Sequence, residues 1–156
     1  MEKVEKLPNM SDCNYVFFLD SLTPLVLSSQ PKLLSVNMSN NLISEIQPGA
    51  FTNMTRLVRL ILSKNKITKL DQNSLAGGRT KILRERSTLI LSSGVSSLVE
   101  LELSNNFLES IPIAALASLD NLKFLNLGSN KIQVNRKKSA GYFVFPSLAS
   151  LLIFVM

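Results

Sequence analysis

Residues 98–108 read Leu-Val-Glu-Leu-Glu-Leu-Ser-Asn-Asn-Phe-Leu, and this stretch decides the fold because its spacing recurs along the chain. The shared pattern, L-x-x-L-x-L-x-x-N-x-L, begins at positions 33, 57, 98 and 122. Residues two apart on a strand point to the same face, so each copy predicts a short strand with its leucines buried. One copy cannot bury its own apolar face, so the copies are predicted to stack into a solenoid with parallel strands.

An asparagine follows each predicted strand, where the chain must turn inward. One side-chain amide offers an acceptor and two donors, which is enough to satisfy backbone groups that the turn leaves in the core. The sequence therefore predicts a structural asparagine ladder made of Asn41, Asn65, Asn106 and Asn130.

On these repeats the chain resembles the leucine-rich-repeat family, in its 24-residue class, over residues 31–134. The resemblance implies an α/β solenoid with a curved parallel β-sheet and with loops, turns or short 3₁₀ pieces on the convex side. The class is common in extracellular proteins and receptor ectodomains, so an extracellular or cell-surface location is expected, although residues 1–8 lack the apolar stretch of a signal peptide. The resemblance also makes the concave sheet the expected binding face for a partner protein.

The second half of each repeat carries its own apolar pattern, which predicts a buried convex wall. Pro48-Gly49 and Pro112 suit tight turns or short 3₁₀ pieces in this part of the repeat. The recurring wall positions are Ile46, Leu70 and Ile111, then Phe51, Leu75 and Leu116, then Met54 and Leu119.

The repeat is interrupted between its second and third copies, which begin 41 rather than 24 residues apart. Removing residues 78–94 restores the spacing, so these residues are interpreted as an insertion. We favour a loop or an alternatively spliced segment at the sheet edge. The alternative is an added irregular strand at Leu89–Leu91, with the basic cluster around it as a contact site.

Both ends of the chain depart from the repeat. Residues 1–30 are interpreted as a degenerate N-terminal flank or half-repeat, because Leu19, Leu22 and Leu27 fall one period before Ile43, Ile46 and Phe51; the expected strand pattern ahead of them is missing. Residues 135–156 form a basic and then hydrophobic tail, whose abrupt start suggests a truncated product of a longer protein. The apolar stretch 140–156 reaches the lower limit for a membrane span, about 17–25 residues. A terminal strand or helix that covers the open end of the solenoid is the alternative.

The solvent-facing strand positions provide the candidate partner-binding surface. Ile61 and Phe124 are apolar side chains suited to anchor an interface. The acidic pair on one strand lies beside basic residues, so cross-strand pairing is favoured over acid–base catalysis. The candidate concave-face residues are Arg59, Ile61, Lys64, Glu100, Glu102, Lys123, Phe124 and Asn126.

Three N-x-S/T triplets mark Asn9, Asn37 and Asn53 as candidate N-glycosylation sites, in keeping with an exported protein. A glycan on Asn37 would occupy part of the concave face.

Composition argues against several function classes. The chain has no histidine and a single cysteine, Cys13, so we expect no enzyme, no metal site and no cofactor. The net charge of +6 comes from residues 78–94 and 135–156, outside the repeats, so nucleic-acid binding is not expected. The sequence predicts a non-catalytic module for a protein ligand or receptor, within a cell-surface or secreted adhesion or signalling protein or a truncated isoform of one. The alternative is a product tethered to a membrane by its C-terminal tail.

Overall fold

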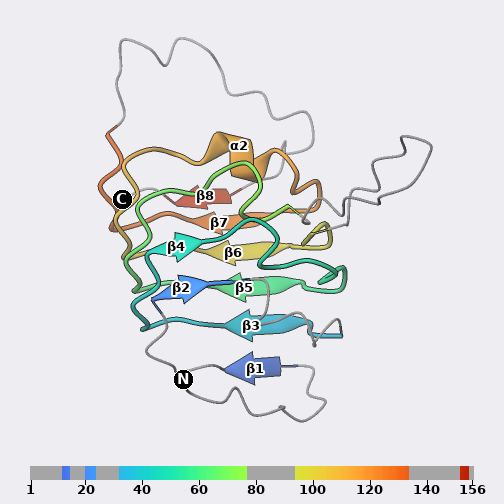
Figure 1. The fold of residues 1–156 in the computed structure, drawn as a ribbon. Coiled ribbons are helices and arrows are strands. Elements are labelled where there is room, and N and C mark those ends of the chain that lie inside the picture. Colours follow the sequence, from blue (N-terminus) through green and yellow to red (C-terminus); the bar gives the residue numbers. More distant parts are fainter. Residues whose placement is uncertain (1–11, 15–19, 24–31, 77–93, 134–151, 155–156) are drawn as a thin grey trace, which may run out of the picture.

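The chain folds into stacked coils with a six-stranded parallel sheet along one side (Figure 1). The computed structural model describes residues 12–14, 20–23, 32–76, 94–133 and 152–154. This main sheet has the order β1-β3-β5-β6-β7-β8, while β2 and β4 form a second, two-stranded parallel sheet. The elements are β1 (Asp12–Asn14), β2 (Ser21–Leu22), β3 (Ser35–Asn37), β4 (Glu45–Ile46), β5 (Arg59–Ile61), β6 (Glu100–Glu102), α2 (Ile113–Leu116), β7 (Phe124–Asn126) and β8 (Leu152–Phe154).

The main sheet keeps the register that the repeat predicts. Val36, Leu60, Leu101 and Leu125 are consecutive partners across β3, β5, β6 and β7, and all four side chains are buried. The residues on either side of them in each strand remain partly or fully exposed. The leucine-rich-repeat solenoid predicted from the sequence is therefore confirmed.

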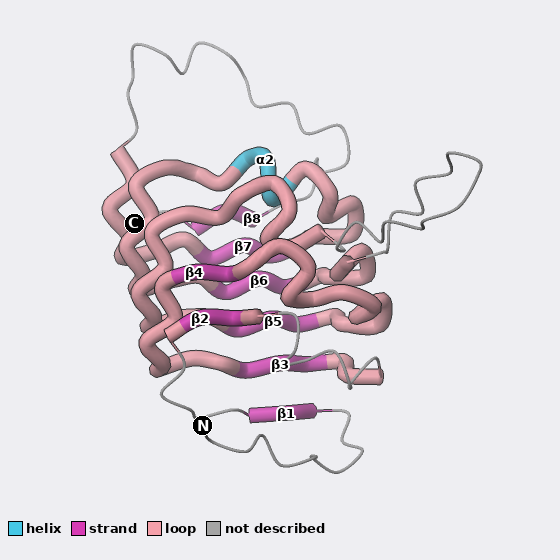
Figure 2. The backbone as a smooth tube through the Cα atoms, in the orientation of Figure 1, coloured by secondary structure: helices cyan, strands magenta, loops and turns pink. Residues whose placement is uncertain are grey.

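A second layer closes the core opposite the main sheet. In Figures 1 and 2 this layer lies nearer the viewer, and in Figure 1 the arrows of β2 and β4 point opposite to those of the main sheet. Seven of the eight predicted wall positions belong to the buried core, and Ile111 packs against it partly buried. Burial of each leucine in this core stabilises the folded state by on the order of 1.5–3 kcal/mol. The apolar side chains packed between the two layers therefore provide most of the stability of the fold.

Each of the strands β3, β5, β6 and β7 is followed by a turn with a left-handed residue. These residues stand directly before the ladder asparagines and have φ between 54° and 58°: Asn40, Lys64, Asn105 and Ser129. Asparagine tolerates this conformation, whereas for most other residues it costs about 1–2 kcal/mol. The turn is repeated in all four coils because it directs the next side chain into the core.

The convex side has the loops and turns that the resemblance implies, and it also contains one short helix that is α-helical and not 3₁₀. Three backbone bonds, Ala115 N and Leu116 N to Pro112 O and Ala117 N to Ile113 O, close one short α-helical turn, α2. Proline suits this start because it needs no partner for a backbone N–H. In the first repeat, Gly49 adopts a φ of 81°, which allows the tight turn expected at Pro48-Gly49.

The N-terminal flank contributes two strands, although the leucine pattern of a strand is missing from its sequence. β1 pairs with β3 in parallel, with Cys13 opposite Val36, and β2 pairs with β4, with Leu22 opposite Ile46. The leucine pattern does not reveal β1 because cysteine stands at the leucine position and the offset to the next strand is 23 rather than 24 residues. Backbone pairing requires an extended chain but no particular side chain.

β5 and β6 are direct hydrogen-bonded partners although the insertion separates them in sequence. The two ends of the interruption meet, because Val95 N donates to Leu75 O at 3.4 Å. Residues 77–93, including the alternative strand Leu89–Leu91, lie outside the described residues, and that alternative remains a prediction.

At the C-terminal end, β8 pairs with β7 and extends the main sheet by one strand. Residues 152–154 of the tail thus form a strand, one of the two alternatives for this segment, and the rest of residues 134–156 lies outside the described residues. No helix within the described ranges has the length and apolar character needed to cross a membrane.

Candidate functional site

The solvent-facing side of the main sheet, here called the open face, is the face predicted to be concave. It carries two rows of side chains that run across the strands. The first row is Ser35, Arg59, Glu100 and Phe124, and the second is Asn37, Ile61, Glu102 and Asn126. Six of the eight predicted contact residues thus stand side by side on three neighbouring strands, β5, β6 and β7.

The first row contains an ion pair. Arg59 Nη2 lies 2.9 Å from Glu100 Oε1, and the two residues are opposite one another on β5 and β6. The two side chains are 50% and 28% exposed, so water screens the pair and its contribution to stability is about 0.2–1 kcal/mol. The pairing nevertheless cancels one positive and one negative charge at the centre of the open face.

Glu102 is the charged residue of the second row. Burial raises the pKa of the Glu102 carboxyl above its usual value, and the negative charge of Glu100 adds to this increase. A side-chain hydrogen bond with Asn126 and the positive charge of Arg59 act in the opposite direction but do not cancel it. Glu102 makes no salt bridge with another described residue, and the positive charge of Arg59 offsets only part of the effect of burial on its carboxylate.

The other two predicted contact residues lie at the rims, outside the two rows. Lys64 is exposed in the turn after β5, and Lys123 is exposed just before β7 begins. The main-sheet strands are only three residues long, so these positions fall beyond opposite ends of the sheet. The predicted set therefore divides into an open-face group of six and one residue on each rim.

The ladder asparagines point into the core and not toward the open face. Asn65 Nδ2 donates to Met38 O at 2.9 Å and to Leu62 O at 3.0 Å, while its Oδ1 accepts from Ile43 N at 3.1 Å. Asn106 and Asn130 make the equivalent bonds one and two coils further along. Each of these amides joins its own coil to the preceding one, as a structural role requires.

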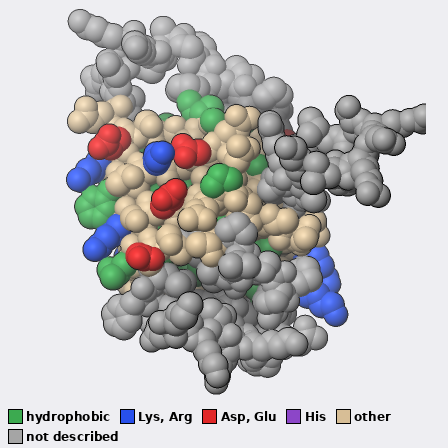
Figure 3. All heavy atoms as spheres, viewed as in Figure 1, with side chains coloured by type: hydrophobic (Ala, Val, Ile, Leu, Met, Phe, Trp, Pro, Cys, Tyr) green, Lys and Arg blue, Asp and Glu red, His purple; other side chains and the backbone are tan. Residues whose placement is uncertain are grey.

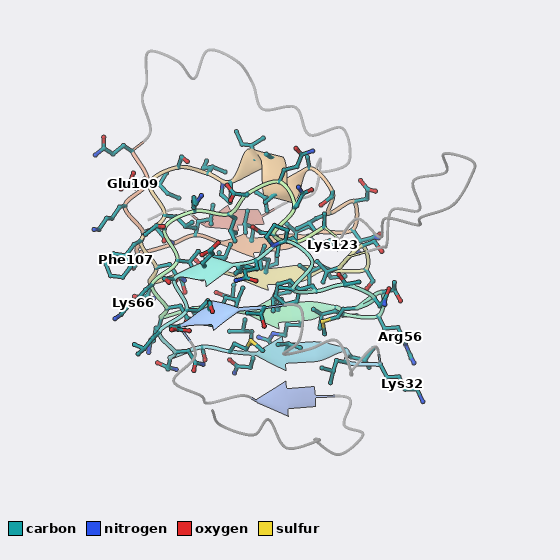
Figure 4. All side chains as sticks on the ribbon, viewed as in Figure 1. Lys32, Arg56, Lys66, Phe107, Glu109 and Lys123 are labelled. Carbon is teal, nitrogen blue, oxygen red and sulfur yellow. The ribbon has the colours of Figure 1, made fainter. Side chains whose placement is uncertain are left out.

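Sequence reasoning missed a further row on the rim after the strands. It consists of the residues that follow the ladder asparagines, namely Leu42, Lys66, Phe107 and Lys131, and all four are exposed. Lys131 Nζ lies 4.8 Å from the centroid of the Phe107 ring, within the range of a cation–π interaction. Figure 4 shows Lys66 and Phe107 projecting from this rim. This row could have been found from the sequence, because each of its members directly follows a ladder asparagine.

The candidate glycosylation sites have different surroundings. Asn37 lies in β3 on the open face, and its Oδ1 accepts from Ser39 N at 3.0 Å and from Ser39 Oγ at 2.7 Å. Asn53 is exposed in a convex turn with a φ of 65°. Asn9 lies outside the described residues.

The open face offers no grouping suited to metal chemistry. Within the ranges that the structure describes, no three His, Cys, Asp or Glu side chains converge as metal ligands would. The chemistry available on this face is therefore a mixture of apolar contact, hydrogen bonding and charge, carried by side chains on a rigid sheet.

Comparison with known proteins agrees with this geometry. A family model described as leucine rich repeat matches residues 31–79 and 92–153. The chain is 31% identical to podocan of Mus musculus over 109 residues, covering 66% of the chain and 18% of podocan. It is 29% identical to keratocan of Danio rerio over 151 residues, covering 96% of the chain and 37% of keratocan. The chain thus spans well under half the length of either relative.

Among solved structures, the Toll–Spatzle complex of Drosophila contains a similar chain. The TM-score is 0.67 at 24% sequence identity, and the alignment covers 89% of this chain and 17% of that one. At this level of identity the similarity concerns the fold alone.

Proposed function

Because the chain belongs to the leucine-rich-repeat family, we propose that it is a non-catalytic module that binds a partner protein on the open face of its main sheet. The partner contacts Arg59, Ile61, Glu100, Glu102, Phe124 and Asn126, with Lys64 and Lys123 at the rims. The strands that carry this surface are hydrogen-bonded to a neighbouring strand on each side. This chain therefore loses little conformational freedom when a partner binds.

The observation that carries this proposal is the position of Glu102 between Ile61 and Asn126 in one cross-strand row. A carboxylate whose pKa is raised by burial sits next to a partly exposed apolar side chain and makes no salt bridge with another described residue. A basic side chain of the partner would compensate this charge, while Ile61 would be covered by apolar contact. Central apolar anchors beside paired charges are typical of binding hot spots.

The ion pair between Arg59 and Glu100 assists recognition of this kind. Since the two charges compensate each other on the free protein, a partner meets one net negative charge in the two rows, on Glu102. Electrostatic complementarity affects the association rate and partner choice more than affinity. We therefore expect a partner surface that is basic opposite Glu102 and apolar around it.

The relatives support a recognition role through what their names state. A rat protein that is 30% identical over 76% of this chain is a leucine-rich repeat-containing G-protein coupled receptor, and the similar solved chain of Drosophila occurs in the Toll–Spatzle complex. We propose on the same basis that this chain acts outside the cell or at its surface, in an adhesion or signalling protein or a shorter isoform of one. The alternative function, a product tethered to a membrane by residues 135–156, remains a prediction; residues 152–154 pair with β7.

Site-specific photocrosslinking on the folded protein tests the proposal. A benzophenone amino acid is placed at Ser35 on the open face and, as a matched control, at exposed Asn73 in a convex turn. We expect incubation with intact cells followed by illumination to give a discrete adduct from position 35 and none from position 73. Glu102→Lys should reduce that adduct by at least about tenfold, which corresponds to about 1.4 kcal/mol.

Two results would contradict the proposal. One is equal adduct formation from both positions. The other is an adduct from position 35 that persists in full in the Glu102→Lys protein while circular dichroism shows that the variant is folded.

A further inference from the structure

An exposed apolar strip runs along the rim where the main-sheet strands begin. Its members are Leu34, Val58 and Val99, which occupy the same place in three consecutive repeats. Val58 N donates to Leu34 O at 2.8 Å, and Val99 N donates to Val58 O at 2.8 Å, so the three residues are neighbours in space. Leu34 is 37% exposed and Val58 is 41% exposed, and Val99 is partly exposed. Lys123 continues the line in the fourth repeat, because its N donates to Val99 O at 2.9 Å.

Cationic side chains border this strip. Lys32 and Arg56 stand two residues before Leu34 and Val58, and Figure 4 labels both, together with Lys123, on the side where the strands begin. In Figure 3, Lys and Arg side chains gather at the lower right edge, on this same side, whereas charges of both signs are interspersed elsewhere on the visible face.

None of these three cations forms a salt bridge with another residue in the described part of the chain. Of the acids near the strip in sequence, Glu100 is paired with Arg59, and exposed Asp120 stands three residues before Lys123. The rim therefore combines an apolar line with a net positive border, and we call it the basic rim.

We propose that the basic rim docks an amphipathic α-helix of a partner protein, with acidic residues beside the apolar face of that helix. This is a second surface beside the open face, and Lys123 lies at the border of both. Aligned apolar side chains call for an apolar partner face, and uncompensated cations at their border call for carboxylates.

The spacing of the strip favours a helix over an extended segment. Neighbouring strands lie about 4.8 Å apart, so the strip spans about 10 Å from Leu34 to Val99. On an α-helix, residues i, i+3 or i+4, and i+7 share one face and span about 10.5 Å, so three successive side chains can meet three successive repeats. On an extended strand, residues of one face repeat about every 6.7 Å, which does not match the spacing of about 4.8 Å between neighbouring repeats. The second side chain of an extended segment would therefore miss the second residue of the strip.

The opposite rim supplies an internal comparison. There the apolar residues Leu42 and Phe107 alternate with Lys66 and Lys131, and the Phe107 ring is already partly engaged by Lys131. That rim has no continuous apolar line. The proposed helix should therefore bind the basic rim and not the opposite rim, because only the basic rim has both an unbroken apolar line and a cationic border.

Three synthetic helical peptides test the proposal by fluorescence anisotropy with the complete chain. The first carries leucines at i, i+4 and i+7 with flanking glutamates. The second replaces the glutamates with lysines, and the third has the composition of the first with the leucines distributed around the helix. We expect the first peptide to bind, and the other two to bind at least about tenfold more weakly. Its affinity should also fall with salt, because exposed charges are screened.

Variants of the chain locate the contact. Val58→Asp and Arg56→Glu should each weaken binding of the first peptide by at least about fivefold, and both residues are exposed, so both variants are expected to fold. Leu42→Asp is the matched control, because Leu42 is also 41% exposed but lies on the other rim. Glu102→Lys on the open face is a second control, and neither control should change the affinity by more than about twofold.

The proposal is overturned by any of three results. These are no binding of the first peptide, equal binding of the glutamate and lysine peptides, and a loss with Leu42→Asp or Glu102→Lys as large as that with Val58→Asp. Circular dichroism of every variant establishes that binding is compared between folded proteins.

Discussion

Asn106 Oδ1 accepts the backbone N–H of Ile67 at 3.1 Å, although the two residues stand 39 positions apart in the chain. The same amide donates to Leu62 O and to Leu103 O, each at 3.0 Å, so one buried side chain satisfies three backbone groups in two coils. The coils are thus joined through a side chain as well as through the sheet.

Replacing Asn106 with alanine should lower the free energy of unfolding by about 1–3 kcal/mol or more, because buried backbone groups lose their partners. Asn130→Ala should cost less, since Asn130 is only partly buried. Urea unfolding followed by circular dichroism measures both. Exposed Asn73→Ala is the control, with an expected change within about 0.5 kcal/mol. A loss for Asn106→Ala no larger than for Asn73→Ala would refute the structural role of the ladder.

Leu101 occupies the centre of β6 with no exposed surface. Leu101→Ala should destabilise the protein by about 2–5 kcal/mol, because the loss of buried methyl groups is accompanied by a cavity. Leu42→Ala removes the same atoms from an exposed site and should change stability by no more than about 0.5 kcal/mol. Thermal and urea unfolding compare the pair, and similar losses for both would show that the assigned core is incorrect.

Glu102 should make stability depend on pH. The pKa of its carboxyl is raised in the folded protein, so the folded state retains this proton to a higher pH than the unfolded state does. Stability should therefore decrease as pH rises from the ordinary glutamate value of 4.5 through the raised pKa. Glu102→Gln does not titrate there, so its stability advantage over the unsubstituted protein should be smallest in acid, grow through this interval and then level off.

Urea midpoints of the two proteins between about pH 3 and pH 8 test this pH dependence. Glu100→Gln is a useful comparison because it removes the ion pair with Arg59. The difference between its urea midpoints and those of the unsubstituted protein should therefore show the loss of that pair and not the titration of Glu102. An advantage of Glu102→Gln that is constant with pH, or largest in acid, would contradict the assigned direction of the pKa shift.

Expression through a secretory pathway should attach a glycan at Asn53. Its side chain is exposed in a convex turn, where a bulky sugar meets solvent. Asn53→Gln should lower the apparent mass on a denaturing gel by the amount of one glycan. Glycosidase treatment of the unsubstituted protein should cause the same shift. Asn37→Gln should cause no such shift, because the Asn37 amide is held within β3 by Ser39. A glycan lost only from Asn37→Gln would reverse this assignment and would obstruct the proposed open-face contact.

The spacing of leucines was sufficient to predict β3, β5, β6 and β7 of the main sheet, because alternation along a strand fixes which side chains are buried. Leu60 and Leu101 occupy equal repeat positions and are direct partners in the structure. The same reasoning could not find β1. There the pattern residue is Cys13 and the offset changes by one residue, whereas backbone pairing tolerates both.

The open face was predictable only in part. Alternation correctly placed Arg59 and Glu100 toward solvent, and equal repeat positions make them neighbours across two strands. The raised pKa of Glu102 depends on how much surrounding atoms exclude water, which one-dimensional spacing does not encode. Lys64 and Lys123 fell on the rims because strand length is set by where backbone pairing stops, and the leucine pattern continues past that point.

The contact between Leu75 O and Val95 N makes the interruption of the repeat a natural place to graft a foreign domain. Its two ends are already next to each other, and β5 and β6 are direct partners across the interruption. Lengthening a connection between fixed ends is inexpensive, at about 0.6 kcal/mol for each doubling. A fluorescent reporter inserted there would leave the stack of coils intact, with both proposed binding surfaces still built from their own repeats.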